Sequence, residues 1–415
     1  MIRRTRQWWL AVGFSWLLLF LPISSAAAED IVLGMSAAFK GASRGLGIEL
    51  YRGSMAFFEY VNREKGGVHG HKIILKAYDD GYDPASAVKN TITLLERDHP
   101  FLLYGYVGTP TVTRVLPLLK LHEERHAFLF FPFTGAQPQR LPPYDGFVFN
   151  LRASYQQETG EMVEQFLKIG RKRIAVFYQI DAYGRSGWDG VRTGLAKHDL
   201  SIAEEATYRR GAPFSSDFGP QVTLLRKAGA DAVICVGAYA ACGAFIREAR
   251  DAGWDIPIAN VSFVGSENLL GLLLEHGKAQ GKDYSANLIN SQVVPNYYRD
   301  DLPAVKEYRE LMDRYKPMPG VELVEADYRP LPYSYVSLEG FLDAKVMVEI
   351  LTRMGDNLDK KRLPEVVESI DRFDVGIDVP VSFGPKHHQG LQRVYFTTVK
   401  DGRFVHLEDW NRWAP

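Results

Sequence analysis

Two apolar segments of this chain run directly into loops of small hydroxyl and glycine residues. The first reads Phe101-Leu-Leu-Tyr-Gly-Tyr-Val-Gly-Thr-Pro-Thr, and the second reads Phe128-Leu-Phe-Phe-Pro-Phe-Thr-Gly-Ala. Continuous apolar runs of this length are typical of strands that are covered on both faces, as in a parallel sheet. Ligands of such sheets bind beyond the carboxyl ends of the strands. We therefore expect a small polar ligand at these turns, held by Gly108, Thr109, Thr134, Gly135 and Ala136.

The N-terminus has the pattern of a secretory signal peptide. A basic start, Met1-Ile-Arg-Arg-Thr-Arg, precedes an apolar run from Trp8 to Ile23 and the small residues Ser24–Ala28. We expect residues 1–28 to be removed, so that the mature protein begins at Glu29 and is a soluble periplasmic protein. A retained membrane anchor is the alternative, but the run is shorter than the about 20 residues that a span requires.

The composition excludes several classes of function. The formal net charge is −1 and no basic block is present, so nothing indicates a nucleic acid partner. The turn residues offer hydroxyls and backbone N–H groups but neither a nucleophile nor a base. We therefore expect a binding protein without catalytic residues, cofactor or metal.

Strand-like and helix-like segments alternate from Ile31 to Leu151, and the same alternation begins again after Arg152. Alternation of this kind predicts a doubly wound parallel sheet. The chain has 415 residues, which is more than one hydrophobic core usually serves. The sequence thus predicts an α/β protein with two lobes of the same build.

Four segments, in their order and spacing, resemble the periplasmic solute-binding proteins of branched-chain amino acid ABC transporters, which have the type I periplasmic binding fold. The first is Leu33-Gly-Met-Ser-Ala-Ala-Phe-Lys-Gly, followed by Gly45-Leu-Gly and Tyr60-Val-Asn-Arg-Glu-Lys-Gly-Gly-Val-His-Gly. The others are Tyr78-Asp-Asp-Gly-Tyr-Asp-Pro, the two turns above, and Tyr178-Gln-Ile-Asp-Ala-Tyr-Gly-Arg-Ser-Gly. The resemblance implies two doubly wound lobes that close on a ligand about a hinge. We place residues 29–152 and 266–379 in the first lobe, and 153–265 and 380–415 in the second.

The resemblance also implies which residues touch the ligand. Ser36 and Phe39 match the first ligand loop, and Thr109 matches a hydroxyl that holds a carboxylate. Thr134 to Ala136 match a loop that offers backbone contacts. Tyr183 and Tyr239 match second-lobe aromatic residues that cover the ligand. A cleft rich in aromatic residues would bury an apolar ligand body, and its expected members are Tyr106, Phe133, Tyr183, Tyr239 and Phe263.

One position departs from the family pattern. Amino-acid binders of this type carry a Glu or Asp after the strand that corresponds to Ile256–Val261, where it pairs with the ligand ammonium, whereas this chain has Ser262. A buried ammonium without a carboxylate is costly. Glu267 is close in sequence but falls at the start of the next helix. A carboxylate, an amide or a largely apolar ligand fits these residues at least as well as an amino acid.

Several motifs resemble patterns that are found in metal sites, nucleotide sites or disulfide bonds. His122-Glu-Glu-Arg-His126 matches the zinc-protease pattern, but the strand expected at Phe128 leaves no room for a continuing helix. His387-His388 has no identifiable partner, and Gly45-Leu-Gly47 lacks the third glycine of a dinucleotide fingerprint. Asp79-Asp80 is expected to cap a turn. The two cysteines, Cys235 and Cys242, are either bridged or buried as free thiols.

The sequence therefore indicates an exported, monomeric binding protein that delivers a small organic solute to an ABC permease. One alternative is a ligand-sensing accessory of a signalling, respiratory or efflux system with the same fold. A more remote alternative is a secreted zinc hydrolase that uses His122 and His126.

Overall fold

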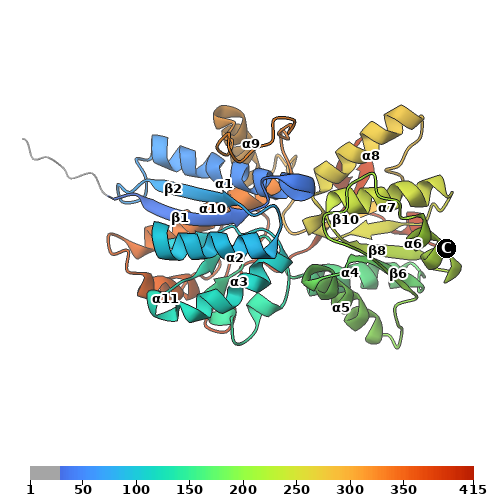
Figure 1. The fold of residues 1–415 in the computed structure, drawn as a ribbon, viewed down its shortest axis with the longest axis horizontal. Coiled ribbons are helices and arrows are strands. Elements are labelled where there is room, and N and C mark those ends of the chain that lie inside the picture. The colour runs from blue at the N-terminus through green and yellow to red at the C-terminus, as the bar shows by residue number, and fades with distance from the viewer. Residues whose placement is uncertain (1–28) are drawn as a thin grey trace, which may run out of the picture.

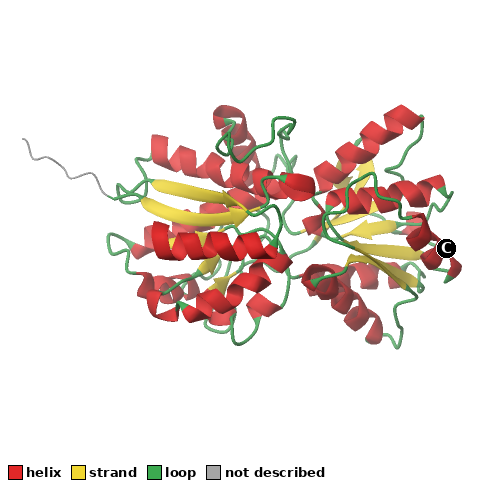
Figure 2. Ribbon diagram, viewed as in Figure 1, coloured by secondary structure: helices red, strands yellow, loops and turns green. Residues whose placement is uncertain are grey.

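The computed structural model describes residues 29–415, and the signal peptide expected at residues 1–28 lies outside them. The chain forms two lobes side by side, each a sheet with helices on its faces (Figure 1). Helices and strands alternate through both lobes (Figure 2). None of the helices in residues 29–415 combines the length and apolar character that a bilayer crossing needs.

The sheet of the first lobe has five parallel strands in the order β2-β1-β3-β4-β5. Their bounds are β1 Ile31–Ala37, β2 Ile73–Asp79, β3 Leu102–Tyr104, β4 Leu129–Phe130 and β5 Val148–Phe149. The helices of this lobe are α1 Arg44–Glu64, α2 Pro84–Thr93, α3 Thr109–Leu121, α9 Pro303–Tyr315, α10 Tyr335–Met354 and α11 Leu363–Glu368. The strand order reverses direction between β1 and β3, the point at which doubly wound sheets bind ligands.

The sheet of the second lobe repeats this order and adds two strands. The order is β12-β11-β10-β9-β8-β6-β7, and only β11 and β12 are antiparallel to their neighbours. The strands are β6 Ile174–Gln179, β7 Glu205–Tyr208, β8 Ala232–Val236, β9 Ile258–Asn260, β10 Leu288–Gln292, β11 Tyr395–Lys400 and β12 Arg403–His406. The helices are α4 Tyr155–Lys168, α5 Ala182–Ala196, α6 Gly219–Lys227, α7 Tyr239–Asp251 and α8 Ser266–Gln280.

The chain passes between the lobes three times, and two of these crossings differ from the sequence expectation. The first falls between β5 and α4. The second follows β10, because β10 pairs with β9 and so belongs to the second sheet, whereas we expected the return to the first lobe at residue 266. The third lies near residue 391 and not at 380, since Gly390 and Leu391 donate backbone hydrogen bonds to Asn150 and Leu151 beside the first crossing.

The first lobe is built around a close contact between α1 and α10. A Cβ on Gly53 would lie 1.7 Å from the carbonyl oxygen of Ser337, and one on Gly340 would lie 2.3 Å from that of Leu50. The two helices therefore touch backbone to backbone on one face of the sheet. On the opposite face, α2 and α3 bury a separate apolar cluster that includes Leu103.

The start of α4 places the first crossing against the second lobe. Ser154 caps this helix by accepting a hydrogen bond from the backbone N–H of Gln157, and the Gln157 side chain accepts one from the backbone N–H of Ser154. Such a capping box satisfies N–H groups that the first helical turn leaves free. It fixes Arg152 and Tyr155 at the boundary between the lobes.

Candidate functional site

The loops at the carboxyl ends of both sheets meet between the lobes. Phe263, in a single 3-10 turn after β9, is fully buried there. Its ring centroid lies 5.3 Å from that of Phe133 and 6.0 Å from that of Tyr82, both in the first lobe. On its own side it lies 4.7 Å from Tyr183 and 6.5 Å from Tyr155. One aromatic side chain thus connects the two lobes over the expected ligand site.

The first-lobe turns provide a compact set of hydroxyls. The Oγ1 atoms of Thr109 and Thr134 lie 2.6 Å apart, and Thr134 Oγ1 also accepts a bond from the N–H of Ala136 at 3.3 Å. Because one hydrogen serves the contact between the two hydroxyls, the other remains available to a ligand. Gly108 comes directly before Thr109 and has φ 99°. A Cβ at this position would lie 2.1 Å from the ring of Tyr82, so this turn requires glycine.

Two tyrosines of the second lobe face these hydroxyls. Tyr155 and Tyr183 are both fully buried, with ring centroids 5.2 Å apart. The backbone N–H of Tyr155 donates to the carbonyl of Gly135 at 2.7 Å, which connects the second lobe to the expected ligand loop of the first lobe. Burial raises the pKa of Tyr155 to about 12, so its hydroxyl is a neutral donor.

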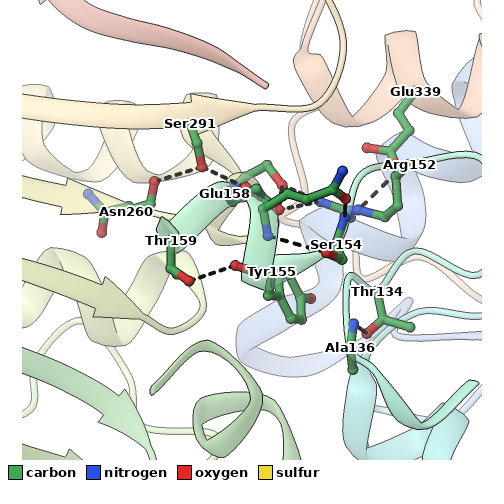
Figure 3. A network of polar contacts seen from close by, with 12 residues as sticks. Thr134, Ala136, Arg152, Ser154, Tyr155, Glu158, Thr159, Asn260, Ser291 and Glu339 are labelled. Carbon is green, nitrogen blue, oxygen red and sulfur yellow. Dashed lines mark hydrogen bonds and ion pairs between the residues drawn. The ribbon is translucent and has the colours of Figure 1, made fainter. Parts of the chain in front are cut away.

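Arg152, Glu158 and Glu339 form a network of buried charges at the hinge (Figure 3). Ser262 is hydrogen-bonded within this network. Its backbone N–H and its hydroxyl donate to the two carboxylate oxygens of Glu158, at 2.8 and 3.0 Å. Ser291 donates a third bond to Glu158 at 2.6 Å. Arg152 donates to Ser262 Oγ and lies 3.6 Å from Glu158. The carboxylate nearest Ser262 is therefore already engaged within the protein.

Arg152 is the central cation of this network. Only 2% of the residue is exposed, and its guanidinium lies 4.6 Å from the ring centroid of Phe133. Its Nη1 atom is 3.5 Å from Glu339 of α10, a carboxyl whose pKa burial raises to about 7 against the opposing effect of Arg152. Within residues 29–415, the Nε and Nη1 atoms of Arg152 and the hydroxyl of Tyr155 have no hydrogen-bond partner. Buried donors without partners are costly, so each of them calls for an explanation.

Four of the predicted site residues lie away from the aromatic cluster around Phe263 and from the hydroxyls of Thr109 and Thr134. Ser36 donates to the buried carboxylate of Asp80 at 2.8 Å, and the ring of Phe39 packs edge-on against Tyr51 of α1. Tyr106 does not line the space between the lobes as we expected. It points under α2 and α3, with its hydroxyl 3.0 Å from Thr91, because side chains alternate between the two faces of an extended segment.

Tyr239 is the fourth, and it lies at the rim of the interface between the lobes. Its hydroxyl accepts a 3.2 Å bond from the backbone N–H of Gly45, at the start of α1. Beside this contact, Arg44 pairs with Glu325 and Asp327 of the proline-rich loop that precedes α10. Tyr239 therefore forms a contact between the lobes and not part of the aromatic cluster.

We predicted no role for Tyr82, Arg152, Tyr155, Glu158 or Glu339. Tyr82 accepts a 3.4 Å hydrogen bond from Gln179 of the second lobe. One signal was available for α4, since Ser154-Tyr-Gln-Gln157 has the spacing of a capping box and would have placed the helix start at the crossing.

The motifs of the remote alternatives have structural roles. Helix α3 ends at Leu121 and His126 adopts φ 51°, so His122 and His126 do not share a helical face. His388 bonds to Glu368 at 3.0 Å and packs on Phe149. Asp79 accepts bonds from the N–H groups of Phe39 and Gly81, as a turn cap does. The two cysteines are free and buried. No group of three His, Cys, Asp or Glu in residues 29–415 is arranged to hold a metal.

Two lobes with the same strand order, crossed three times by the chain and joined by an aromatic cluster at their carboxyl edges, define a two-lobed binding protein of the type I periplasmic kind. Residues 30–403 match the family described as periplasmic binding protein. The chain belongs to this family, which confirms the fold and the solute-binding function predicted from the sequence.

Relatives and solved structures agree with this placement. The "Leu/Ile/Val-binding protein homolog 3" of Brucella melitensis biotype 1 is 26% identical over 275 residues, which cover 64% of this chain and 72% of the relative. A "possible leucine/isoleucine/valine-binding protein" from Rhodopirellula baltica SH 1 has a TM-score of 0.81 and 30% identity, covering 93% of this chain and 98% of that one. A substrate-binding periplasmic protein from Ralstonia solanacearum has a TM-score of 0.78 and 27% identity, covering 91% and 100%.

Proposed function

We propose that this protein captures a small organic solute between its two lobes in the periplasm and delivers it, as a monomer, to the permease of an ABC importer. The solute contacts the hydroxyls of Thr109 and Thr134 on the first lobe and the rings of Tyr183 and Phe263 on the second. The protein performs no chemistry on the solute.

The observation that carries this proposal is the position of Phe263. It is a second-lobe side chain, yet it packs on Phe133 and Tyr82 beside the hydroxyls of the first lobe. In the proposed cycle, these contacts form when the lobes close. A ligand that touches both sets of residues binds the closed form better than the open form, and this difference drives closure.

Closure and uptake test the proposal together. Small-angle scattering on the mature protein from Glu29 to Pro415, with and without a mixture of small organic acids, amino acids and amides, should show a smaller radius of gyration with solute. A strain that lacks the protein should lose uptake of the solute that causes the change. The proposal would be overturned if no mixture changes the radius of gyration and the strain takes up the same solutes at the normal rate.

Export and assembly are tested on the same material. We expect the protein in the periplasmic fraction with Glu29 at its N-terminus, and a monomer mass by light scattering. Recovery of an uncleaved, membrane-bound chain would contradict the periplasmic location.

A further inference from the structure

The strongest unassigned feature of the molecule is the set of buried hydrogen-bond donors without partners beside Ser262. It comprises Nε and Nη1 of Arg152 and the hydroxyl of Tyr155. Tyr155 is fully buried and Arg152 is 2% exposed, so solvent does not replace a missing partner. Both residues adjoin the aromatic cluster, since the guanidinium of Arg152 lies 4.6 Å from the Phe133 ring and 5.8 Å from the Tyr155 ring.

We propose that the solute is an organic acid with an apolar body and no ammonium group, and that Arg152 and Tyr155 bind its carboxylate. This inference rests on the proposed function, because it assigns the ligand class of the same site. A carboxylate has two acceptor oxygens that match the guanidinium and phenol donors, and charge-assisted bonds of this kind are the strongest hydrogen bonds available in a protein. The rings of Phe263, Tyr183 and Phe133 pack on one another beside these donors and provide apolar contacts for the ligand body.

The charges around the site disfavour an amino acid. A ligand ammonium near Ser262 would lie beside the guanidinium of Arg152, which donates to the Ser262 hydroxyl. The nearest carboxylate, Glu158, is already bonded to Ser262 N–H, Ser262 Oγ and Ser291 Oγ. The site therefore combines a repulsive cation with an occupied acceptor, an arrangement that rejects a cationic ligand group.

The remaining ionisable groups leave the site short of negative charge. Arg140 lies against the same loop and donates to the carbonyl oxygens of Ala136 and Arg152. Burial raises the pKa of Glu339 to about 7 and the pKa of Asp343 well above its usual range. Two guanidinium groups are thus only partly balanced at neutral pH, and a ligand carboxylate completes the balance. An amide offers the same shape without the charge.

Two sets of three ligands, each set sharing one carbon skeleton, test this assignment by calorimetry on the mature protein. The first set is 3-phenylpropanoate, L-phenylalanine and 3-phenylpropanamide, and the second is 4-methylpentanoate, L-leucine and 4-methylpentanamide. We expect at least one of the two acids to bind at least tenfold tighter than its amino acid and its amide. Tighter binding of an amino acid or an amide overturns the carboxylate assignment while the proposed function stands, and the same holds if all six fail but a solute without a carboxylate closes the lobes.

Variants assign the effect to the two donors. Tyr155→Phe should weaken binding of the acid by about tenfold to a hundredfold, as expected for the loss of a hydrogen bond to a charged group. Tyr284→Phe removes a hydroxyl that bonds to Asp251 on α7, in a part of the second lobe that does not touch Phe263 or Arg152, and should leave affinity unchanged. Arg152→Gln should abolish acid binding. Because that variant leaves Glu158 and Glu339 without their cation, Tyr155→Phe is the decisive variant, and wild-type affinity in Tyr155→Phe overturns the assignment.

Discussion

Replacement of Phe263 by leucine measures how much of the binding energy comes from contact between the lobes. Two of its four aromatic neighbours, Tyr82 and Phe133, lie in the first lobe, and the other two, Tyr155 and Tyr183, lie in the second. Leucine keeps most of the apolar volume but loses the ring-to-ring geometry. Each aromatic pair contributes about 0.5–1.5 kcal/mol beyond the area that it buries.

If the lobes close on the solute as proposed, the two pairs between the lobes form on closure, and together they contribute about 1–3 kcal/mol. Since a tenfold change in affinity corresponds to about 1.4 kcal/mol, Phe263→Leu should raise the Kd of the bound acid by about fivefold to 150-fold. The two pairs within the second lobe persist in the open form. Their loss should lower the free energy of unfolding of the ligand-free protein by a similar amount.

Calorimetry on Phe263→Leu and urea unfolding of its ligand-free form separate these two contributions. Phe177→Leu is the matched control, because Phe177 is equally buried but its ring neighbours, Tyr208, Phe218 and Phe245, all lie in the second lobe. The control should lose stability and keep its affinity. If Phe263→Leu also loses stability but keeps its Kd within about twofold, Phe263 belongs to a lobe core and the reasoning is wrong.

Three further predictions concern the buried polar groups. Glu158→Gln should lower the free energy of unfolding in urea by about 3–5 kcal/mol, because it removes the negative charge that pairs with the buried Arg152. The control Glu275→Gln, at an exposed site, should leave the free energy of unfolding unchanged. Equal stabilities of the two variants would refute the role of the network. Burial raises the pKa of Asp80 to about 7 against an ordinary value of 3.8. Its contribution to stability is therefore complete below about pH 4 and is lost as the pH rises toward 7. Asp80→Asn should flatten the dependence of the unfolding free energy on pH over that range, and an unchanged slope would contradict this assignment. Cys235 and Cys242 should react with a thiol reagent only after denaturation, and rapid labelling of the native protein would contradict their burial.

The segments that sequence analysis predicted well are those whose apolar pattern matches their burial. The apolar runs that begin at Phe101 and Phe128, for example, contain the buried strands β3 and β4. In contrast, β10 escaped notice because Asn290, Ser291 and Gln292 are polar yet fully buried. Asn290 and Gln292 bond to Ser266, and Ser291 bonds to Glu158. A strand whose side chains complete a buried polar network lacks the apolar run that marks a buried strand, and this moved the expected second crossing from the end of β10 to residue 266.

Part of the candidate site could be predicted because several of its residues directly follow strands that the sequence marks by their apolar pattern. Thr109, Thr134, Tyr183 and Phe263 follow strands in the sequence, so their place at the carboxyl edges could be inferred. Arg152, in contrast, follows a two-residue strand and belongs to no motif, and its importance comes from burial between two lobes. Tyr106 was misplaced because the face that a side chain takes after a strand depends on register, which the sequence alone does not specify.

A crystal structure of the mature protein with 3-phenylpropanoate or 4-methylpentanoate, whichever binds more tightly, would show which residues hold the carboxylate. We expect closed lobes, a ligand body in contact with Phe263, Tyr183 and Phe133, and a carboxylate within about 3 Å of Tyr155 Oη and of Arg152 Nε or Nη1. A ligand outside the space between the lobes, or a carboxylate that Arg152 and Tyr155 do not touch, would contradict this expectation.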